Sequence, residues 1–305
     1  DGGLARYRLR LSPWIWRLGQ VRNSRVWQDK PVTEIVDTVF ASYRPLARWR
    51  WSVYTGPFLR DILPRPYCCQ YRESDLDFVR RILAEEGLGW RIEQDADGPM
   101  LVLFGDSSHP RALPEDLSSA ASGAVRYHAA RAVEQDDTVQ ALTAQRRLQA
   151  ALTTMLSYDY KAKQIVARGS PSRLAHPRHL PVLEAFDVPG QETFATLAQA
   201  RHYTDLQMEG KEARAELWHG RSTVRTLRAG TRLKLAGLPV RARGNNAAFA
   251  LTRVLSVGVN NMPPPAQHAL AELFGPISEL LEESVQRDWP QDAALRKFLR
   301  LYIKQ

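Results

Sequence analysis

Residues 65–94 have the sequence RPYCCQYRESDLDFVRRILAEEGLGWRIEQ, and the order of residue types in this stretch decides the fold around it. Residues 67–71 predict a short strand. Ser74 is a good N-cap for a helix that follows, with Asp77 three positions later as a weaker capping-box partner. The helix has one apolar face, and Gly87 is expected to end it. That face is formed by Leu76, Val79 and Leu83, flanked by Phe78 and Ile82.

The residues after this helix predict two strands joined by a tight turn. Leu88, Trp90 and Ile92 alternate with Gly89, Arg91 and Glu93, which is the period of a strand. Residues 95–98, DADG, predict the turn, and residues 100–104, MLVLF, predict the second strand. The stretch therefore predicts a helix followed by a hairpin.

The acidic residues of this stretch have two interpretations. Asp75 and Asp77 form an Asp-x-Asp pair of the kind that binds a divalent cation in metal sites. The same two residues would occupy the first helical turn, where negative charge complements the helix dipole, a small effect at exposed positions. Glu85 and Glu86 lie about three turns further on and cannot share a site with Asp75. We favour the structural interpretation.

The two cysteines of the chain, Cys68 and Cys69, are neighbours. Adjacent α-carbons lie about 3.8 Å apart, which is shorter than the usual span of a disulfide. On a strand the two side chains would point to opposite faces, and we expect them to behave as small apolar groups. Two thiols alone also make a poor metal site. Cysteine usage therefore favours folding in a reducing compartment.

The composition is that of an ordinary soluble protein with a basic bias. Of 305 residues, 44% are hydrophobic and 25% are charged, and no run of about 20 apolar residues predicts a membrane helix. The formal charge is +9, and residues 1–60 hold 11 Lys/Arg against 4 Asp/Glu, while residues 201–243 hold 10 against 4. These regions could bind nucleic acid or an acidic protein surface. The arginines are interleaved with apolar residues and no nucleic-acid motif accompanies them, which favours solvated strand faces.

Other segments of the first half are assigned from periodicity. Residues 4–11, LARYRLRL, predict a strand that places Ala5, Tyr7, Leu9 and Leu11 on one face and Arg6, Arg8 and Arg10 on the other, with partner strands upstream of this chain. Residues 31–40 predict a helix with Pro31 near its start and an apolar stripe of Val32, Ile35, Val36 and Val39. Residues 44–66 and 105–124 predict irregular structure, and residues 138–152 fit either a helix or a strand.

The second half predicts a strand, a helix and then further strands. The first strand is expected over residues 180–188, followed by a turn at Pro189 and Gly190 and a helix over residues 193–208. The later strands are expected at 212–219, 222–228, 231–236 and 249–259, with turns at Gly220, Gly230 and Gly237. Beyond Pro263 the spacing predicts helices, one with Leu270, Leu273 and Phe274, one with Ile277, Leu280 and Leu281, and one over residues 292–304.

No sequence motif argues for catalysis. The run HPRH, residues 176–179, offers two imidazoles, but no nearby cysteine or acid completes a metal site, and Glu184 is the closest acid. The chain contains no G-x-S-x-G, P-loop, dinucleotide fingerprint or zinc-protease helix. The other histidines are scattered: His109, His128, His202, His219 and His268. We therefore predict no catalytic, cofactor-binding or metal-binding residues and no cofactor.

Several of these segments resemble the VgrG family of type VI secretion spike proteins. The resemblance is to the tube-like base of that family, which is itself similar to phage tail baseplate hub proteins. It extends from residue 4 to Asn261 and is weaker over 105–150 and 162–180. The segments that carry it are RNSRVWQDKPVTEIVDTVF (22–40), PRPYCCQYRESDLDFVRRILAEEGLGWRIEQ (64–94), YDYKA (158–162) and the spacing from LEAFDVPG (183–190) to LRAGTRLKLAG (227–237).

The resemblance implies an α+β fold with two mainly antiparallel, β-barrel-like domains decorated by helices, and a helical C-terminal tail. Residues 1–120 would be the remainder of the first hub-like β domain with the inserted helix–hairpin unit. Residues 121–261 would be the second hub-like β domain, and residues 262–305 the tail. The opening strands of the first barrel, the OB-fold and the spike of the family are not in this sequence, which implies a fragment.

The resemblance also implies a structural function and no enzymatic activity. Three copies would form a homotrimeric base on which an Hcp-like tube protein stacks, and a PAAR tip and effectors would be carried through regions absent here. The protein would assemble in the bacterial cytoplasm, without a membrane partner, and then be secreted or injected into target cells. Two alternatives stay open: a contractile phage or phage-like tail baseplate hub, and a basic nucleic-acid-binding protein, with nucleic acid the less favoured partner.

Overall fold

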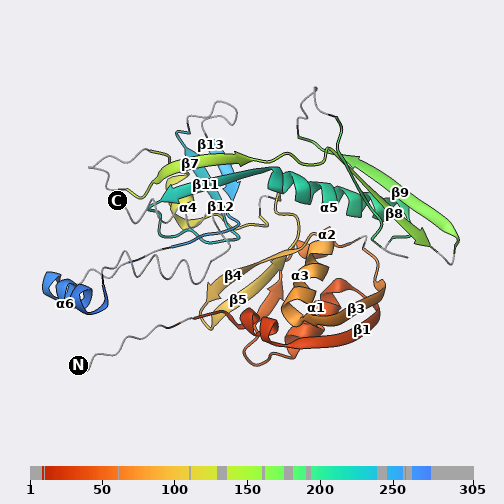
Figure 1. Ribbon diagram of the computed structural model, residues 1–305, viewed down its shortest axis with the longest axis horizontal. Coiled ribbons are helices and arrows are strands. Elements are labelled where there is room, and N and C mark those ends of the chain that lie inside the picture. The colour runs from red at the N-terminus through yellow and green to blue at the C-terminus, as the bar shows by residue number, and fades with distance from the viewer. Residues whose placement is uncertain are drawn as a thin grey trace. The chain divides into compact units, whose positions relative to one another are not determined.

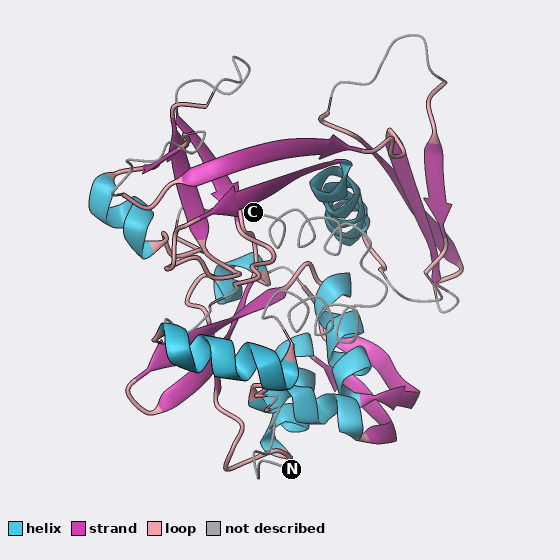
Figure 2. Ribbon diagram, turned by 60° about the vertical axis from the view of Figure 1, so that its left-hand side comes forward, coloured by secondary structure: helices cyan, strands magenta, loops and turns pink. Residues whose placement is uncertain are grey.

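The computed structural model describes residue 9 and residues 11–60, 62–109, 111–128, 136–159, 162–174, 181–189, 194–238, 246–256, 258 and 263–275. Residues 1–254 form one compact unit and residues 255–305 form another. In the first unit helices and strands are mixed along the chain (Figure 2). The expected α+β class is confirmed, because most of the strand pairs are antiparallel. The described strands form five small sheets, and none of these closes into a barrel.

The first part of this unit contains the helix and hairpin that the sequence predicts. Strand β1 pairs antiparallel with β3, and a second sheet has β5 in the centre, parallel to β2 and antiparallel to β4. The elements are η1 (Trp14–Gln20, a 3-10 helix), β1 (Arg22–Lys30), α1 (Val32–Ala41), β2 (Trp49–Trp51), α2 (Thr55–Phe58), β3 (Arg65–Ser74), α3 (Asp75–Glu85), β4 (Gly89–Asp95) and β5 (Gly98–Phe104).

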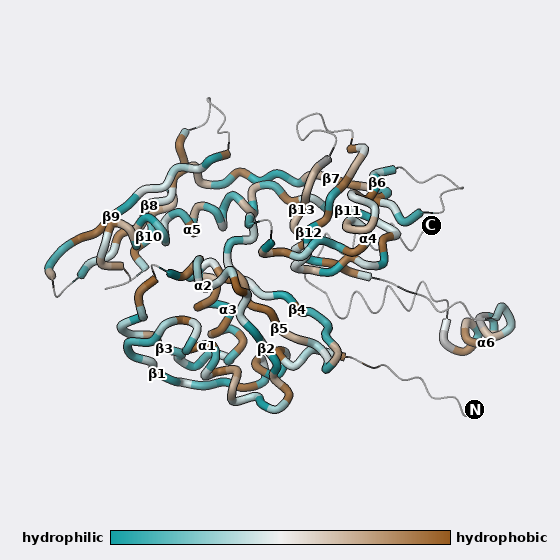
Figure 3. The backbone as a smooth tube through the Cα atoms, turned by 180° about the vertical axis from the view of Figure 1, so that it is seen from behind, coloured by the Kyte–Doolittle hydropathy of each residue, from teal (hydrophilic) through white to brown (hydrophobic). Residues whose placement is uncertain are grey.

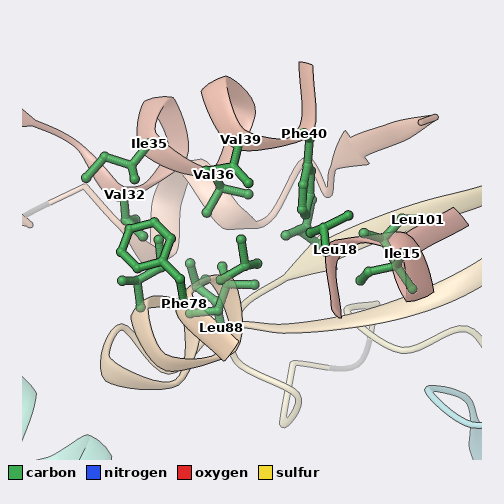
Figure 4. Packing of buried hydrophobic residues seen from close by; sticks show 14 of the residues in the cluster. Ile15, Leu18, Val32, Ile35, Val36, Val39, Phe40, Phe78, Leu88 and Leu101 are labelled. Carbon is green, nitrogen blue, oxygen red and sulfur yellow. The ribbon is translucent and has the colours of Figure 1, made fainter. Parts of the chain in front are cut away.

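The largest core among the described residues lies between helices α1 and α3, and η1 and β5 complete it (Figure 4). The predicted stripe of α1 is confirmed, because its four apolar residues are all buried. On α3 the predicted apolar face is also confirmed, with Phe78 stacked on Trp27 of β1 at a centroid distance of 5.0 Å. The two helices therefore bury their apolar faces together, which is the main source of stability for such short helices.

Helix α3 begins and ends where the sequence predicts. The backbone N–H of Asp77 donates to Ser74 Oγ at 3.1 Å, and the Ser74 hydroxyl donates to the Asp77 carboxylate at 2.6 Å. At the other end Gly87 has a φ of +68°, in the left-handed region that glycine adopts without strain. The cap and the terminating glycine therefore fix both ends of the helix.

The second part of this unit contains a long helix and three sheets. Strand β8 lies between β10, parallel to it, and β9, antiparallel to it; β7 pairs with β11, and β12 lies between β13 and β6. The elements are α4 (Leu117–Ser122), β6 (Val125–Arg126), β7 (Val139–Arg146), β8 (Leu152–Asp159), β9 (Gln164–Pro171), β10 (Glu184–Asp187), α5 (Leu197–Ala215), β11 (Glu216–Ser222), β12 (Arg232–Ala236) and β13 (Asn246–Ala250). In the unit of residues 255–305, α6 (Pro264–Phe274) is described.

Two further clusters of buried residues lie in this second part. One joins the strands β6, β7, β12 and β13 and includes Val125, Val139, Leu233 and Leu235. The other lies where α5 packs along β8 and β9 (Figure 1), and it consists of Met155, Val166, Phe194 and Ala200. Burial follows hydropathy: in Figure 3 the fully buried middle of β5 is hydrophobic, whereas β1 and β3 are mainly hydrophilic.

Some expectations for the first half are wrong. Leu9 and Leu11 are not in a strand and are 85% and 93% exposed, because no described strand of this chain pairs with them. The rest of that expected strand, with Arg6, Arg8 and Arg10, lies outside the described residues. Residues 44–66 are not all irregular, since β2 and α2 form there, and β2 pairs with the distant β5. Within 105–124, α4 forms because Asp116 caps it, accepting the N–H of Ser118 at 3.0 Å.

The second half also differs at its boundaries. The ambiguous residues 138–152 contain β7 and the first residue of β8. The strand expected at 180–188 is limited to β10, and residues 175–180 and 190–193 lie outside the described part. The helix expected at 193–208 instead begins at Leu197, because Thr196 and Gln199 form a capping box, and it continues to Ala215. Strand β11 therefore starts at Glu216 and includes Gly220, which is not a turn.

The strands expected after β11 agree with the structure only in part. Residues 223–228 form no strand, although Val224 is buried, and only Ser222 belongs to β11. The strand expected at 231–236 is confirmed as β12, and the one at 249–259 is confined to residues 246–250, where it pairs with β12. Of the expected tail helices, α6 is described, and residues 276–305 lie outside the described part.

Candidate functional site

The carboxylate of Asp75 is a buried centre of hydrogen bonds. Its side chain is fully buried at the start of α3 and accepts hydrogen bonds from three elements. The donors are Asn23 Nδ2 at 3.0 Å, Arg25 at 3.4 Å, Tyr43 Oη at 2.7 Å and Gln70 Nε2 at 2.8 Å. Both oxygens are thus occupied by protein donors, as buried charges require. The arrangement makes Asp75 a junction between β1, β3 and the end of α1.

The acids of the opening stretch lie in different environments. Asp77 is exposed and caps α3 together with Ser74, whereas the Asp75 side chain is buried, so the two carboxylates have different roles. The expectation that Asp75 lies exposed in the first turn is wrong, because a ring of donors from β1 and β3 encloses it. Within the described residues no group of three or more His, Cys, Asp or Glu side chains could hold a metal ion.

Glu86 forms a second buried junction, at the other end of α3. Arg65 donates to its carboxylate at 3.0 Å and 2.6 Å, and the Tyr203 hydroxyl of α5 donates at 3.1 Å. Burial lowers the pKa of Arg65, but the carboxylates of Glu86 and Glu85 outweigh burial and hold that pKa above its ordinary value. Burial and the charge of Glu86 raise the pKa of Tyr203. Glu85 and Glu86 are therefore separate from Asp75, as expected, and Glu86 connects β3 to α5.

Sequence reasoning missed the roles of Tyr203 and Glu86. Tyr203 lies 117 residues from Glu86, and no pattern within either segment predicts that they meet. Glu86 follows the last residue of α3, a position where an acid normally remains in solvent. Of the three residues in this junction, Arg65 alone could have been suspected from the sequence. It is a basic residue at the start of a strand, and the helix that follows ends in two acids. Long-range pairs of this kind become visible only when the fold is known.

Three strands present an apolar face to solvent. The pairing of β8 with β9 and β10 places the alternate residues of the three strands on one side of the sheet. Ile165 is 65% exposed and Phe186 is 60% exposed on this side. We call this side the outer face; it consists of Leu152, Thr154, Leu156, Tyr158, Ile165, Ala167, Gly169, Pro171, Glu184 and Phe186. Glu184 is the one charged residue among these ten.

Helix α5 covers the opposite side of the same sheet. Met155 and Val166 pack there against Ala200, and Ser170 Oγ donates to Asp205 of α5 at 2.7 Å. The sheet is therefore already packed on one side, and its outer face is an additional apolar surface. Contiguous exposed apolar surfaces of this kind mark interaction sites in soluble proteins. Among the described strands, β9 and β10 each pair with β8 alone, so both edges of the sheet are also open.

Histidines and cysteines show no reactive arrangement in the described part of the chain. The ring of His109 packs against Tyr54 at 4.6 Å, and the ring of His202 packs against Tyr203 at 5.5 Å. The HPRH run lies outside the described residues. Cys68 is buried, and burial raises the pKa of its thiol; Cys69 is half-buried, and both are free, as expected. None of the described helices has the length and hydropathy that crossing a membrane requires.

Comparisons with known proteins identify relatives of most of the chain. A family model described as phage tail baseplate hub (GPD) matches residues 1–262. The type VI secretion system spike protein VgrG5 of Pseudomonas aeruginosa is 30% identical over 84% of this chain and 30% of its own length. The spike protein VgrG3 of Vibrio cholerae is 29% identical over 75% of this chain and 21% of its own length. The chain thus spans less than a third of these two relatives.

Solved structures show weaker similarity. The E. coli c3393 protein, a component of the type VI secretion system, has a TM-score of 0.46 and 16% identity, over 79% of this chain and 51% of that chain. A tail protein from Neisseria meningitidis has a TM-score of 0.48 and 13% identity, over 77% of this chain and 65% of that chain.

Proposed function

Since the chain belongs to the phage tail baseplate hub family, we propose that it is a structural subunit of a type VI secretion spike base. The spike proteins of Pseudomonas aeruginosa and Vibrio cholerae support the secretion assignment, because they match three quarters or more of the chain. In this proposal the chain acts by assembling with other subunits and catalyses no reaction. It takes part in delivering effectors that other regions or other subunits carry.

The outer face of the β8–β9–β10 sheet is the observation that carries the proposal. A subunit with a formal charge of +9 repels its own copies through most of its surface. A face with one charged residue among ten avoids this repulsion and gains free energy when it leaves water. Self-association through this face is what a ring-forming base subunit needs. We therefore assign the outer face to contacts between copies of this chain in a homotrimer.

The finer features of the proposal follow from the family. An Hcp-like tube protein would stack on the trimeric base, and a PAAR tip would lie at the far end of the spike. The subunit would assemble in the bacterial cytoplasm and then be secreted or injected into target cells. Residues 1–120 and 121–261 would act as the two hub-like β domains of each subunit, with 262–305 as a helical tail.

The oligomeric state of the purified chain tests this proposal. We expect multi-angle light scattering to report a trimer, and Ile165→Glu with Phe186→Glu to convert it to a monomer, because two carboxylates would be buried at the contact. The matched control is Val53→Glu with Leu63→Glu, since these residues are also exposed apolar positions, at 77% and 58%, but lie outside the outer face. A monomeric wild-type chain, or a trimer that survives Ile165→Glu with Phe186→Glu, would contradict the proposal.

A phage or phage-like tail baseplate hub is the second candidate, and the family match favours it directly. Both candidates predict the same trimer, so the identity of the neighbouring genes distinguishes them. A secretion spike predicts tube, sheath and secretion genes nearby, whereas a phage hub predicts capsid and tail genes. The nucleic-acid hypothesis is tested by a salt titration, because phosphate contacts make affinity fall steeply as salt rises.

A further inference from the structure

Two arginines on the β1–β3 ribbon lack an acidic partner. Five basic side chains lie on these strands, and three of them are matched with carboxylates: Arg25 with Asp75, Lys30 with Glu34, and Arg65 with Glu85 and Glu86. Arg22 and Arg72 form no ion pair with any described residue. Both are exposed, and they come from neighbouring strands. Within the described part of the chain, the ribbon therefore carries one pair of cations without an acidic partner.

These two arginines line one cavity. The cavity has a volume of about 550 Å³, is open to solvent, and is lined by Arg22, Asn23, Ser24 and Arg72. It lies where the pairing of β1 with β3 shifts register between Asn23 and Arg25, so an extra residue is accommodated there. Bulges of this kind redirect side chains and are common beside functional sites. The bulge brings Arg22 and Arg72, from neighbouring strands, to the lining of one cavity.

The backbone beside the cavity is held in one arrangement. Arg72 has a φ of +52°, which is uncommon for a residue other than glycine, and its N–H donates to Ser24 Oγ at 3.2 Å. Because Ser24 accepts this hydrogen bond, its hydroxyl proton is left to donate to another group. The Asn23 side chain is held in place because its amide donates to the buried Asp75 carboxylate at 3.0 Å. The cavity thus offers two guanidinium groups and a hydroxyl on a rigid support.

We propose that this cavity binds a carboxylate from an acidic segment of a partner protein. A carboxylate accepts two parallel hydrogen bonds from a guanidinium, and two guanidinium groups at one cavity repel each other until an anion lies between them. Apolar contacts for such a segment are at hand, because Tyr71 is 69% exposed on the same ribbon and Val26 is 54% exposed. The site is separate from the outer face of the β8–β9–β10 sheet and does not depend on the proposed trimer.

The charge pattern favours a protein segment over nucleic acid. Nucleic acid binding draws on many cations that follow the phosphate backbone. Neighbouring cations are already matched: Arg65 of β3 with Glu85 and Glu86, and Arg81 of helix α3 with Glu73 and Glu85. Two free arginines at one compact cavity fit a single carboxylate or a pair of adjacent ones. They do not form a track along which a chain of phosphates could lie.

Fluorescence anisotropy on the full chain tests the proposal. The probes are a labelled peptide of alternating glutamate and serine, the same peptide with glutamine in place of glutamate, and a labelled single-stranded oligonucleotide. We expect the glutamate peptide to bind and Arg22→Gln with Arg72→Gln to weaken it by about tenfold or more. The matched control is Arg111→Gln with Arg147→Gln, which removes the same charge at exposed positions away from the cavity and should change the affinity less than about twofold.

Several outcomes would overturn the assignment. One is an equal loss of affinity in Arg22→Gln with Arg72→Gln and in the control variant, because binding would then depend on net charge alone. Another is binding of the glutamine peptide as tightly as the glutamate peptide. A third is an oligonucleotide that binds more tightly than the peptide and is released by Arg22→Gln with Arg72→Gln, which would assign the cavity to phosphate. Arg72→Gln alone, and Ser24→Ala, give independent measurements that should each weaken the glutamate peptide.

Discussion

The Tyr43 hydroxyl donates a 2.7 Å hydrogen bond to the Asp75 carboxylate, and this contact joins the end of α1 to the start of α3. Burial, together with the hydrogen bond to Asp75, raises the pKa of Tyr43, so the hydroxyl remains a donor at any physiological pH. The same carboxylate accepts a hydrogen bond from Asn23, which lines the cavity between Arg22 and Arg72, here called the arginine cavity. One buried acid therefore connects the main core to the candidate partner site.

Asp75→Asn is expected to destabilise the chain by roughly 2–4 kcal/mol, since it removes a buried charge from donors that remain in place. Asp77→Asn should cost less than about 1 kcal/mol, because that side chain is exposed and acts at the helix terminus. Urea unfolding of both variants measures the difference. Neither variant should alter a titration with calcium, magnesium or manganese. A metal affinity in the micromolar range that Asp75→Asn abolishes would contradict the structural role.

Helix α3 should depend more on its buried face than on its cap. Leu83→Ala is expected to cost about 2–5 kcal/mol, because the side chain is 1% exposed and its removal leaves a cavity in the main core. Ser74→Ala is expected to cost about 1 kcal/mol, since one capping hydrogen bond is lost. Thermal melting of the two variants shows which substitution lowers the melting temperature more. A larger loss from Ser74→Ala than from Leu83→Ala would show that the cap, and not the core, holds the helix.

Gly87→Ala should destabilise the junction between α3 and α5. Its φ of +68° is strained for alanine, and a Cβ there would lie 2.6 Å from Leu206 Cδ2. We expect a loss of about 2–3 kcal/mol from strain and crowding together. Gly56→Ala is the matched control, because a Cβ at that glycine meets nothing within 4 Å and its φ is ordinary. Equal urea midpoints for the two variants would contradict the close approach of Leu206.

Alkaline pH should destabilise the chain partly through Tyr203. Tyrosine in an unfolded chain ionises near pH 10, whereas burial and the charge of Glu86 raise the pKa of Tyr203 in the folded chain. Above about pH 10 the unfolded state has lost a proton that the folded state keeps, so the free energy of unfolding falls as pH rises through this range. This contribution is fully present below about pH 10 and disappears as pH passes the folded pKa.

The variant Tyr203→Phe has no such proton to lose. Its free energy of unfolding should be lower than that of the wild type at neutral pH, because the hydrogen bond to Glu86 is gone. Between about pH 9 and about pH 11 it should decline less steeply than the wild type. Urea titrations at several pH values measure both slopes. Parallel slopes would show that the ionisation of Tyr203 is not linked to folding.

Local sequence patterns predicted the elements whose signals are local. The cap at Ser74, the terminating Gly87 and the hairpin of β4 and β5 depend on residues a few positions apart, and all three are confirmed. Periodicity also identified the buried stripe of α1. It did not predict the environment of β4, where Arg91 is buried and donates to the Ala112 carbonyl at 2.9 Å while Ile92 is 38% exposed. Arginine is usually exposed and isoleucine usually buried, and here a hydrogen-bond acceptor far away in the sequence allows the opposite arrangement.

Elements that depend on distant partners could not be predicted. Strand β2 exists because β5 lies beside it, and the alternation of residues 4–11 did not place Leu9 and Leu11 in a strand. The candidate sites are of the same kind: the outer face requires the pairing of three strands, and the arginine cavity requires the bulge between β1 and β3. The division into domains at residues 120 and 261, and the absence of catalytic, cofactor and metal residues, stay predictions.

The pairing of β7 with β11 marks the base of an inserted part of the chain. Arg146 lies opposite Glu216 in this ladder, and just beyond it the N–H of Arg147 donates to the Ala215 carbonyl at 2.8 Å. The segment between Arg147 and Ala215 includes β8, β9, β10 and α5. It leaves the β7–β11 ladder and returns to it at the same end, and it contains its own buried cluster. The loops of such a segment can be lengthened in evolution while β7 and β11 keep their register, although α5 stays tied to α3 through Tyr203 and Glu86. A protein engineer could use the same point to graft a foreign domain onto the subunit.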